Sequence, residues 1–140
     1  MDSNIITGSC HCGNVKFRGE IEKNLRNSIT EKCNCSICFK TRLWYIKVNE
    51  KNLEVNKGKD NMEIYEFGQK DNTYYFCKNC HIELFGLYKP KNKPNVNAFY
   101  VVSVATIDGL SPKDLSELKV IYLDGLNDNL ESKPEYTHYL

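Results

Sequence analysis

Seven cysteines in three close clusters constrain this chain of 140 residues more than any other feature. The clusters are a C-x-C pair, a C-x-C-x-x-C triplet and a C-x-x-C pair, formed by Cys10 and Cys12, by Cys33, Cys35 and Cys38, and by Cys77 and Cys80. Close pairs of this kind point two sulfurs at one centre, which suits a tetrahedral zinc ion. We therefore expect a fold in which distant turns meet around metal ions.

The cysteines can be divided between metal sites in more than one way. The first and last pairs could close one four-thiolate site and leave the triplet as a three-thiolate site, or the triplet could close a site with one end pair. The first division uses every cysteine, so spacing favours it modestly. Three protein ligands with an open position are typical of catalytic zinc, whereas four are typical of structural zinc. A histidine could instead complete the triplet, and the only candidates are His11, His81 and His138.

The cysteine count and the terminal sequence both predict a cytoplasmic protein that can also reach the nucleus. The N-terminal residues lack the basic flank and apolar segment of a secretory signal, and no apolar run approaches the length needed to span a membrane. A reducing compartment and an odd number of cysteines argue against a disulfide framework. The net charge of +1 lacks the basic excess of a general nucleic-acid-binding protein.

Short β-type segments separated by turn residues predict a mainly β chain. Alternating, aromatic or β-branched runs are typical of strands, and they occur at residues 14–17, 43–48, 62–67, 73–76, 84–88, 98–107 and 119–123. One helix start is visible, where Ser111 can cap a first turn that begins with Pro112. We expect one domain over residues 1–140.

Three motifs give the chain a specific resemblance. Residues 8–17 (GSCHCGNVKF) resemble the opening motif of the GFA family, the glutathione-dependent formaldehyde-activating enzymes. Residues 33–40 (CNCSICFK) resemble the second motif and residues 76–80 (FCKNC) the third, and both also resemble centromere protein V, a eukaryotic relative. The resemblance implies a mainly β fold called a β-tent, in which zinc pins small antiparallel sheets and at most one or two short helices occur.

The resemblance also implies a role for each cysteine. By motif, the structural zinc ligands would be Cys10, Cys12, Cys77 and Cys80. The catalytic zinc would be held by Cys33, Cys35 and Cys38. The implied reaction is carbon–sulfur lyase chemistry, the reversible formation of S-(hydroxymethyl)glutathione from glutathione and formaldehyde. An open position on the second zinc would suit it, because a metal-bound thiol loses its proton near neutral pH.

Basic residues beside the triplet are candidates for binding glutathione. Lys32, Lys40 and Arg42 could hold its carboxylates, and the alternative is that they are ordinary solvated side chains. The aromatic residues Trp44 and Tyr45 could wall a pocket, although aromatic residues in a strand more often belong to the core.

Asn34 and Ser36 lie between the triplet cysteines and are expected to hydrogen-bond backbone or sulfur around the site. The chain departs from the family pattern at His81, where glycine usually follows the third motif. This position often needs a positive φ, which histidine tolerates better than most residues. His81 could instead lie near a metal as a ligand or proton shuttle.

Two other functions compete with the enzyme. A non-catalytic zinc scaffold that binds partners is allowed by the resemblance to centromere protein V, but the basic N-terminal region tied to that role is absent before Cys10. A thiol redox protein is the third hypothesis, and it predicts exposed thiolates without tightly held metal. The sequence does not indicate an oligomeric state.

Overall fold

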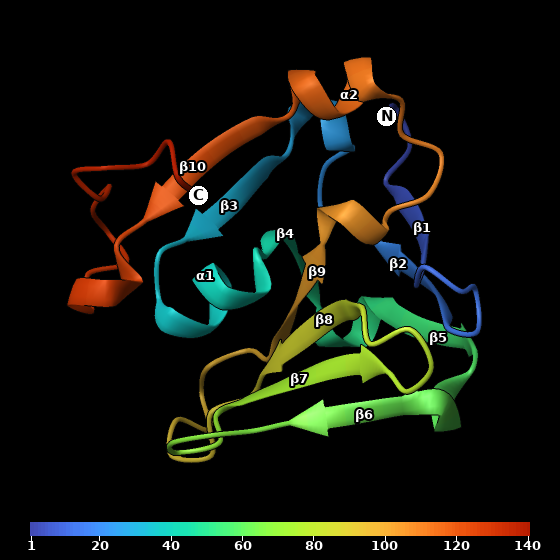
Figure 1. Ribbon diagram of the computed structural model, residues 1–140, viewed down its shortest axis with the longest axis horizontal. Helices are drawn as coiled ribbons and strands as arrows, with labels where there is room; N and C mark the ends of the chain where they lie inside the picture. The colour runs from blue at the N-terminus through green and yellow to red at the C-terminus, as the bar shows by residue number, and fades with distance from the viewer.

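The computed structural model describes residues 1–140 and confirms a mainly β architecture with two short helices (Figure 1). The strands are β1 (Ile5–Ser9), β2 (Lys16–Glu20), β3 (Ile29–Cys33), β4 (Trp44–Asn49), β5 (Leu53–Lys57), β6 (Met62–Tyr65), β7 (Asn72–Cys77), β8 (Glu83–Tyr88), β9 (Phe99–Ser103) and β10 (Lys119–Leu123). The helices are α1 (Ser36–Thr41) and α2 (Pro112–Glu117), with 3-10 turns at Leu25–Asn27, Glu50–Asn52, Lys59–Asn61, Val104–Thr106 and Gly125–Asn127. No helix has the length and apolar character needed to cross a membrane.

The strands form two sheets. The smaller has the order β1-β2-β5, and the larger has the order β10-β3-β4-β9-β8-β7-β6. Strands β3 and β10 diverge from β6, β7 and β8, and α1 lies between these two groups (Figure 1). This divergence opens the larger sheet around the segment that carries the cysteine triplet.

Most neighbouring strands are antiparallel, as expected, but β3 and β10 are parallel. Two parallel strands need a long connection between them. Here the connection from β3 to β10 contains the strands β4 to β9 and the helices α1 and α2. The sequence pattern gave no sign of this return. The strands β1, β3 and β5 and the helix α1 were also not predicted from the sequence.

The helix start at Ser111 is confirmed by a complete capping box. The Ser111 hydroxyl accepts a hydrogen bond from the Asp114 N–H at 3.1 Å, and the Asp114 carboxylate accepts one from the Ser111 N–H at 2.9 Å. The predicted strand at residues 98–107 is shorter than expected, because the chain turns into a 3-10 turn after Ser103.

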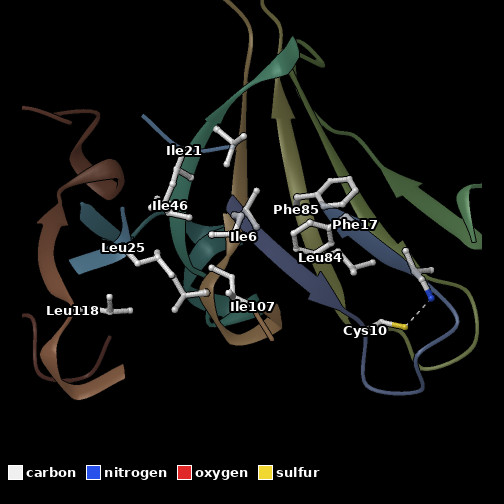
Figure 2. Close-up of a cluster of buried hydrophobic side chains, with 14 of the residues drawn as sticks. Ile6, Cys10, Phe17, Ile21, Leu25, Ile46, Leu84, Phe85, Ile107 and Leu118 are labelled. Atoms are coloured by element: carbon white, nitrogen blue, oxygen red, sulfur yellow. Dashed lines mark hydrogen bonds between the residues drawn. The ribbon is translucent and has the colours of Figure 1, made fainter. Parts of the chain in front are cut away.

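One hydrophobic core joins the two sheets. Phe17 of β2 and Phe85 of β8 are each 1% exposed, and their ring centroids lie 5.6 Å apart in an edge-to-face contact. Burying one such side chain stabilises the fold by roughly 1.5–3 kcal/mol. Figure 2 shows this aromatic pair with Leu84, and Cys10 at the edge of the same cluster. The first cysteine cluster is thus built onto the core that holds the sheets together.

Candidate metal centres

The first and last cysteine pairs meet in one four-sulfur group. The turn after β1 carries Cys10 and Cys12, and the end of β7 with its following turn carries Cys77 and Cys80. All four sulfurs lie within 4.8 Å of one another. This group contains residues from both sheets, and it is the first of the two divisions that the spacing allowed.

The four-sulfur group has the dimensions of a tetrahedral metal site. Cys12 Sγ lies 3.6 Å from Cys10 Sγ and 3.7 Å from Cys77 Sγ. Four sulfurs placed ~2.3 Å from a central zinc ion would be about 3.8 Å apart, whereas a disulfide would need ~2.05 Å. All seven cysteines are free, so the thiols are available as metal ligands.

Backbone and side-chain N–H groups favour the thiolate form of Cys12, whereas burial raises the pKa of Cys77 to about 11. The Val15 N–H donates to Cys10 Sγ at 3.3 Å, and the Asn79 N–H donates to Cys77 Sγ at 3.4 Å. Hydrogen bonding by Asn79 and by the backbone of Asn14 lowers the pKa of Cys12 to about 6. Groups that donate to the charged form stabilise it, which is what a metal ligand requires.

His81 closes the turn of the third motif in the conformation expected from the sequence. Its φ is +61°, and its N–H donates to the Cys77 carbonyl at 2.9 Å. The side chain is exposed, and the four-sulfur group is complete without it. Histidine therefore occupies a position that favours glycine, and the hypothesis that it is a metal ligand gains no support from this geometry.

The three cysteines of the middle motif form a second, separate group. Cys33 ends β3, Cys35 is the N-cap residue of α1, and Cys38 lies within α1. Their sulfurs lie within 4.8 Å of one another, and no fourth side chain of the histidine, cysteine, aspartate or glutamate type joins them. The short helix α1 folds Cys38 back toward Cys33, which is why the C-x-C-x-x-C spacing brings three sulfurs together.

The ionisation of the triplet fits a cation. Hydrogen bonds from Cys33 and Cys38 hold the pKa of Cys35 at about 3, whereas contact with Cys35 raises the pKa of Cys33. Contacts with Cys33 and Cys35 likewise raise the pKa of Cys38. Without a cation the three sulfurs therefore share protons, because adjacent negative charges repel one another. A divalent metal ion would allow all three to ionise, so the donor set fits a metal.

A turn from the C-terminal part of the chain supports the triplet. The Asn34 side chain donates to Asp124 at 2.9 Å and accepts from the Leu126 N–H at 2.8 Å, which confirms its expected backbone contact. Gly125 is thereby held so close to the triplet that an added Cβ would clash with Cys33 Sγ and lie 2.9 Å from the Cys35 Cβ. Sequence reasoning missed Gly125, because nothing local links it to cysteines that lie about 90 residues earlier.

The larger of two cavities at the triplet is mainly apolar. It has a volume of about 540 Å³, and 12 of its 17 lining residues are hydrophobic. All three triplet cysteines line it, together with Tyr45. Tyr45 is 7% exposed, so it belongs to the core, as expected, and also forms part of the cavity wall.

The smaller cavity is basic on one side and is contacted by the C-terminal residues. It has a volume of about 220 Å³ and is lined by Lys32, Arg42, Trp44, Cys33, Cys38, Phe39, Leu43, Ala105 and Leu140. Lys32 donates to the Leu140 main-chain oxygen at 3.0 Å, and Arg42 donates to the Tyr139 carbonyl at 2.7 Å. The structure thus places Lys32 and Arg42 at the triplet, whereas the exposed Lys40 lines neither cavity.

Glu83 is a second residue that sequence reasoning missed. It begins β8, is 9% exposed, and neither of its carboxylate oxygens has a hydrogen-bond partner. Burial raises the pKa of Glu83 to about 7. A single glutamate in an otherwise apolar strand, ELFGLY, was the available signal that a carboxyl group would be buried.

The fold and the two sulfur groups define a mainly β protein with two candidate metal centres. The model of the glutathione-dependent formaldehyde-activating enzyme (GFA) family matches residues 5–125, and the chain belongs to this family. A crystal structure of a Rhodobacter sphaeroides protein is similar at 28% sequence identity and a TM-score of 0.66. The match covers 81% of this chain and 98% of that protein.

Replacing Gly125 with alanine should empty the triplet without disturbing the four-sulfur group. The added methyl group displaces Cys33 Sγ, so we expect Gly125→Ala to bind about one metal ion fewer per chain and to remain folded. Elemental analysis with circular dichroism measures both quantities. The control is Gly19→Ala in β2, where the nearest atom to the added Cβ is a flexible isoleucine carbon at 3.3 Å. Unchanged metal content in Gly125→Ala would contradict the assignment.

Glu83 should make stability fall as pH rises. Its pKa of about 7 in the folded protein exceeds the ordinary value of 4.5, so folding favours the protonated form, and the cost of burial grows between these two pH values. At pH 8 the charged carboxyl costs roughly 3 kcal/mol, at ~1.4 kcal/mol for each pKa unit. The melting temperature of Glu83→Gln relative to wild type should therefore rise from pH 5 to pH 8. A parallel pH profile for both proteins would refute this, and the exposed Glu63→Gln is the control.

Proposed function

We propose that this protein is a zinc-dependent enzyme of the carbon–sulfur lyase type that forms and cleaves adducts between glutathione and a small aldehyde. The family supplies the expectation of glutathione and formaldehyde. The observation that carries the proposal is the triplet of Cys33, Cys35 and Cys38, which gathers three sulfurs beside two cavities. A group of three thiolates beside space for a small molecule is the arrangement of a metal site that accepts a substrate.

The two cysteine groups would have different roles, one structural and one catalytic. Cys10, Cys12, Cys77 and Cys80 would hold a structural zinc ion, which has no position left for a substrate. Cys33, Cys35 and Cys38 would hold the second zinc ion. When bound there, zinc supplies an open coordination position and lowers the pKa of a thiol placed at it.

The basic side of the smaller cavity would orient glutathione. Lys32 and Arg42 donate to main-chain oxygens of the C-terminal residues, and a carboxylate of glutathione would replace these acceptors. The Tyr139 carbonyl is a neutral acceptor, so a carboxylate would form the stronger hydrogen bond with Arg42. Lys32 also lies 5.4 Å from the centre of the Trp44 ring, which limits where its charge can move.

The reaction depends more on holding the thiol next to the carbonyl and excluding water than on a separate acid or base side chain. A carbon–sulfur bond forms between the glutathione sulfur and the carbonyl carbon, and the proton lost by the thiol ends on the carbonyl oxygen. Cleavage reverses these changes, so no oxidant or reductant takes part. The apolar walls of the larger cavity would keep water from the reacting carbonyl, and the buried Cys33 with the half-buried Cys35 and Cys38 would hold the centre in place.

Replacing Cys35 with serine should separate the two roles. We expect Cys35→Ser to retain one zinc ion and a folded core, and to lower the rate of S-(hydroxymethyl)glutathione formation to that of the uncatalysed reaction. Elemental analysis and NMR measure the two quantities. Cys12→Ser, the matched change in the other group, should instead lower the melting temperature markedly, because metal binding contributes to folding. A Cys35→Ser protein with the full rate would overturn the proposal.

Arg42 and Lys40 provide a matched pair of basic residues that lie two positions apart at the end of α1. Arg42→Met removes a donor from the smaller cavity and should weaken glutathione binding about tenfold, with a smaller effect on turnover. Lys40→Met removes the same charge from a residue outside both cavities and should have little effect. Titration calorimetry with glutathione measures the difference. If the two substitutions weakened glutathione binding equally, the basic residues would attract the glutathione carboxylates only by their charge, and Arg42 would not be a specific ligand.

A further inference from the structure

The larger cavity at the triplet is far bigger than the one-carbon group of a formaldehyde adduct requires. Its volume of about 540 Å³ lies within the range of sites that enclose drug-sized ligands, roughly 300–1,000 Å³. The three cysteines lie in its wall, so a molecule that reacts at the triplet can extend into this space. The size of the cavity therefore bears directly on the substrate.

The charges of this cavity do not suit glutathione itself. Its one cationic lining residue, Lys47, is paired with Glu31 at 3.1 Å and lies 5.2 Å from the Phe99 ring centre. The remaining charged lining residue is Asp128, which is negative. A carboxylate placed here would lose water without gaining a free cation, which is costly. The anionic carrier therefore belongs on the side of Lys32 and Arg42.

The walls of the cavity are suited to a flat or branched apolar group. Tyr45 and Tyr74 are 7% and 6% exposed, and Tyr88 and Phe99 pack with ring centroids 5.2 Å apart. Val101 of β9 also lines the cavity. Aromatic walls bury large apolar area and favour stacked or edge-to-face contacts with a ring.

We propose that the aldehyde-derived half of the substrate is a bulky apolar group, aromatic or branched aliphatic, which fills the cavity around Tyr74, Phe99 and Val101. This inference rests on the thiol–aldehyde function proposed above and extends its substrate class from formaldehyde to larger aldehydes. The bond changes are the same as for formaldehyde: a carbon–sulfur bond forms, and the thiol proton ends on the carbonyl oxygen. Only the group attached to the carbonyl carbon differs.

Stable thioethers test the cavity without relying on turnover. Titration calorimetry of the zinc-loaded protein should show that S-benzylglutathione binds about tenfold or more tightly than S-methylglutathione, because the benzyl group buries more apolar surface. Equal affinities of the two thioethers would overturn the proposal and leave the assignment of glutathione intact.

Two variants test where the benzyl group lies. Val101→Phe fills the cavity, and Ile121→Asp places a charge in its wall at a residue that is 42% exposed and so tolerates substitution. Both should lower the ratio of the affinity for S-benzylglutathione to that for S-methylglutathione to about one. The control is Val96→Phe at an exposed residue that lines a different cavity. A preference that survives in both variants would overturn the assignment to this cavity.

Simple thiols separate failure of this inference from failure of the proposed function. Benzyl mercaptan and ethanethiol carry no glutathione, so their affinities report on the cavity alone. If neither thioether binds but benzyl mercaptan binds about tenfold more tightly than ethanethiol, the apolar cavity stands and glutathione is the wrong carrier. If benzyl mercaptan shows no advantage either, the cavity does not receive an apolar group and the inference is wrong.

Discussion

The rest of the structure depends on the link between the β1–β2 turn and the β7–β8 turn, where four cysteine sulfurs lie within 4.8 Å of one another. These turns belong to different sheets, and Phe17 and Phe85 pack across the same junction. Four thiolates cannot remain this close without a cation, because their charges repel. A metal ion bound there would therefore fix the angle between the sheets, while the aromatic pair of Phe17 and Phe85 fills the space between them.

The triplet is placed differently, and its surroundings explain why it suits chemistry. One segment, from the end of β3 through α1, carries all three of its cysteines, so it does not cross-link sheets. Distant parts of the chain enclose it instead: Gly125 and Asn34 fix one side, and Lys32 and Arg42 face a second. The two sheets are joined by the four-sulfur group and the aromatic core, so the triplet can lack a fourth protein ligand without disrupting the fold.

Short-range pattern and motif spacing predicted much of this arrangement. The strand runs and the start of α2 at Ser111 follow from local chemistry that the sequence displays. The spacing only favoured the pairing of the end cysteines, and the resemblance to the GFA motifs assigned it. The parallel return of β10, the contact of Gly125 with Cys33 and the burial of Glu83 depend on long-range packing, which no local pattern encodes. His81 shows the intermediate case, because its positive φ followed from the family pattern and its role did not.

The central claim is that the chain holds two zinc ions, one with four sulfur ligands and one with three. X-ray absorption at the zinc edge tests it most directly, because it counts the sulfur and lighter ligands of the bound metal. The account predicts seven sulfurs shared between two zinc ions, with one nitrogen or oxygen ligand that glutathione replaces by an eighth sulfur. Four sulfurs around every zinc before glutathione is added, or no change on adding it, would contradict the account.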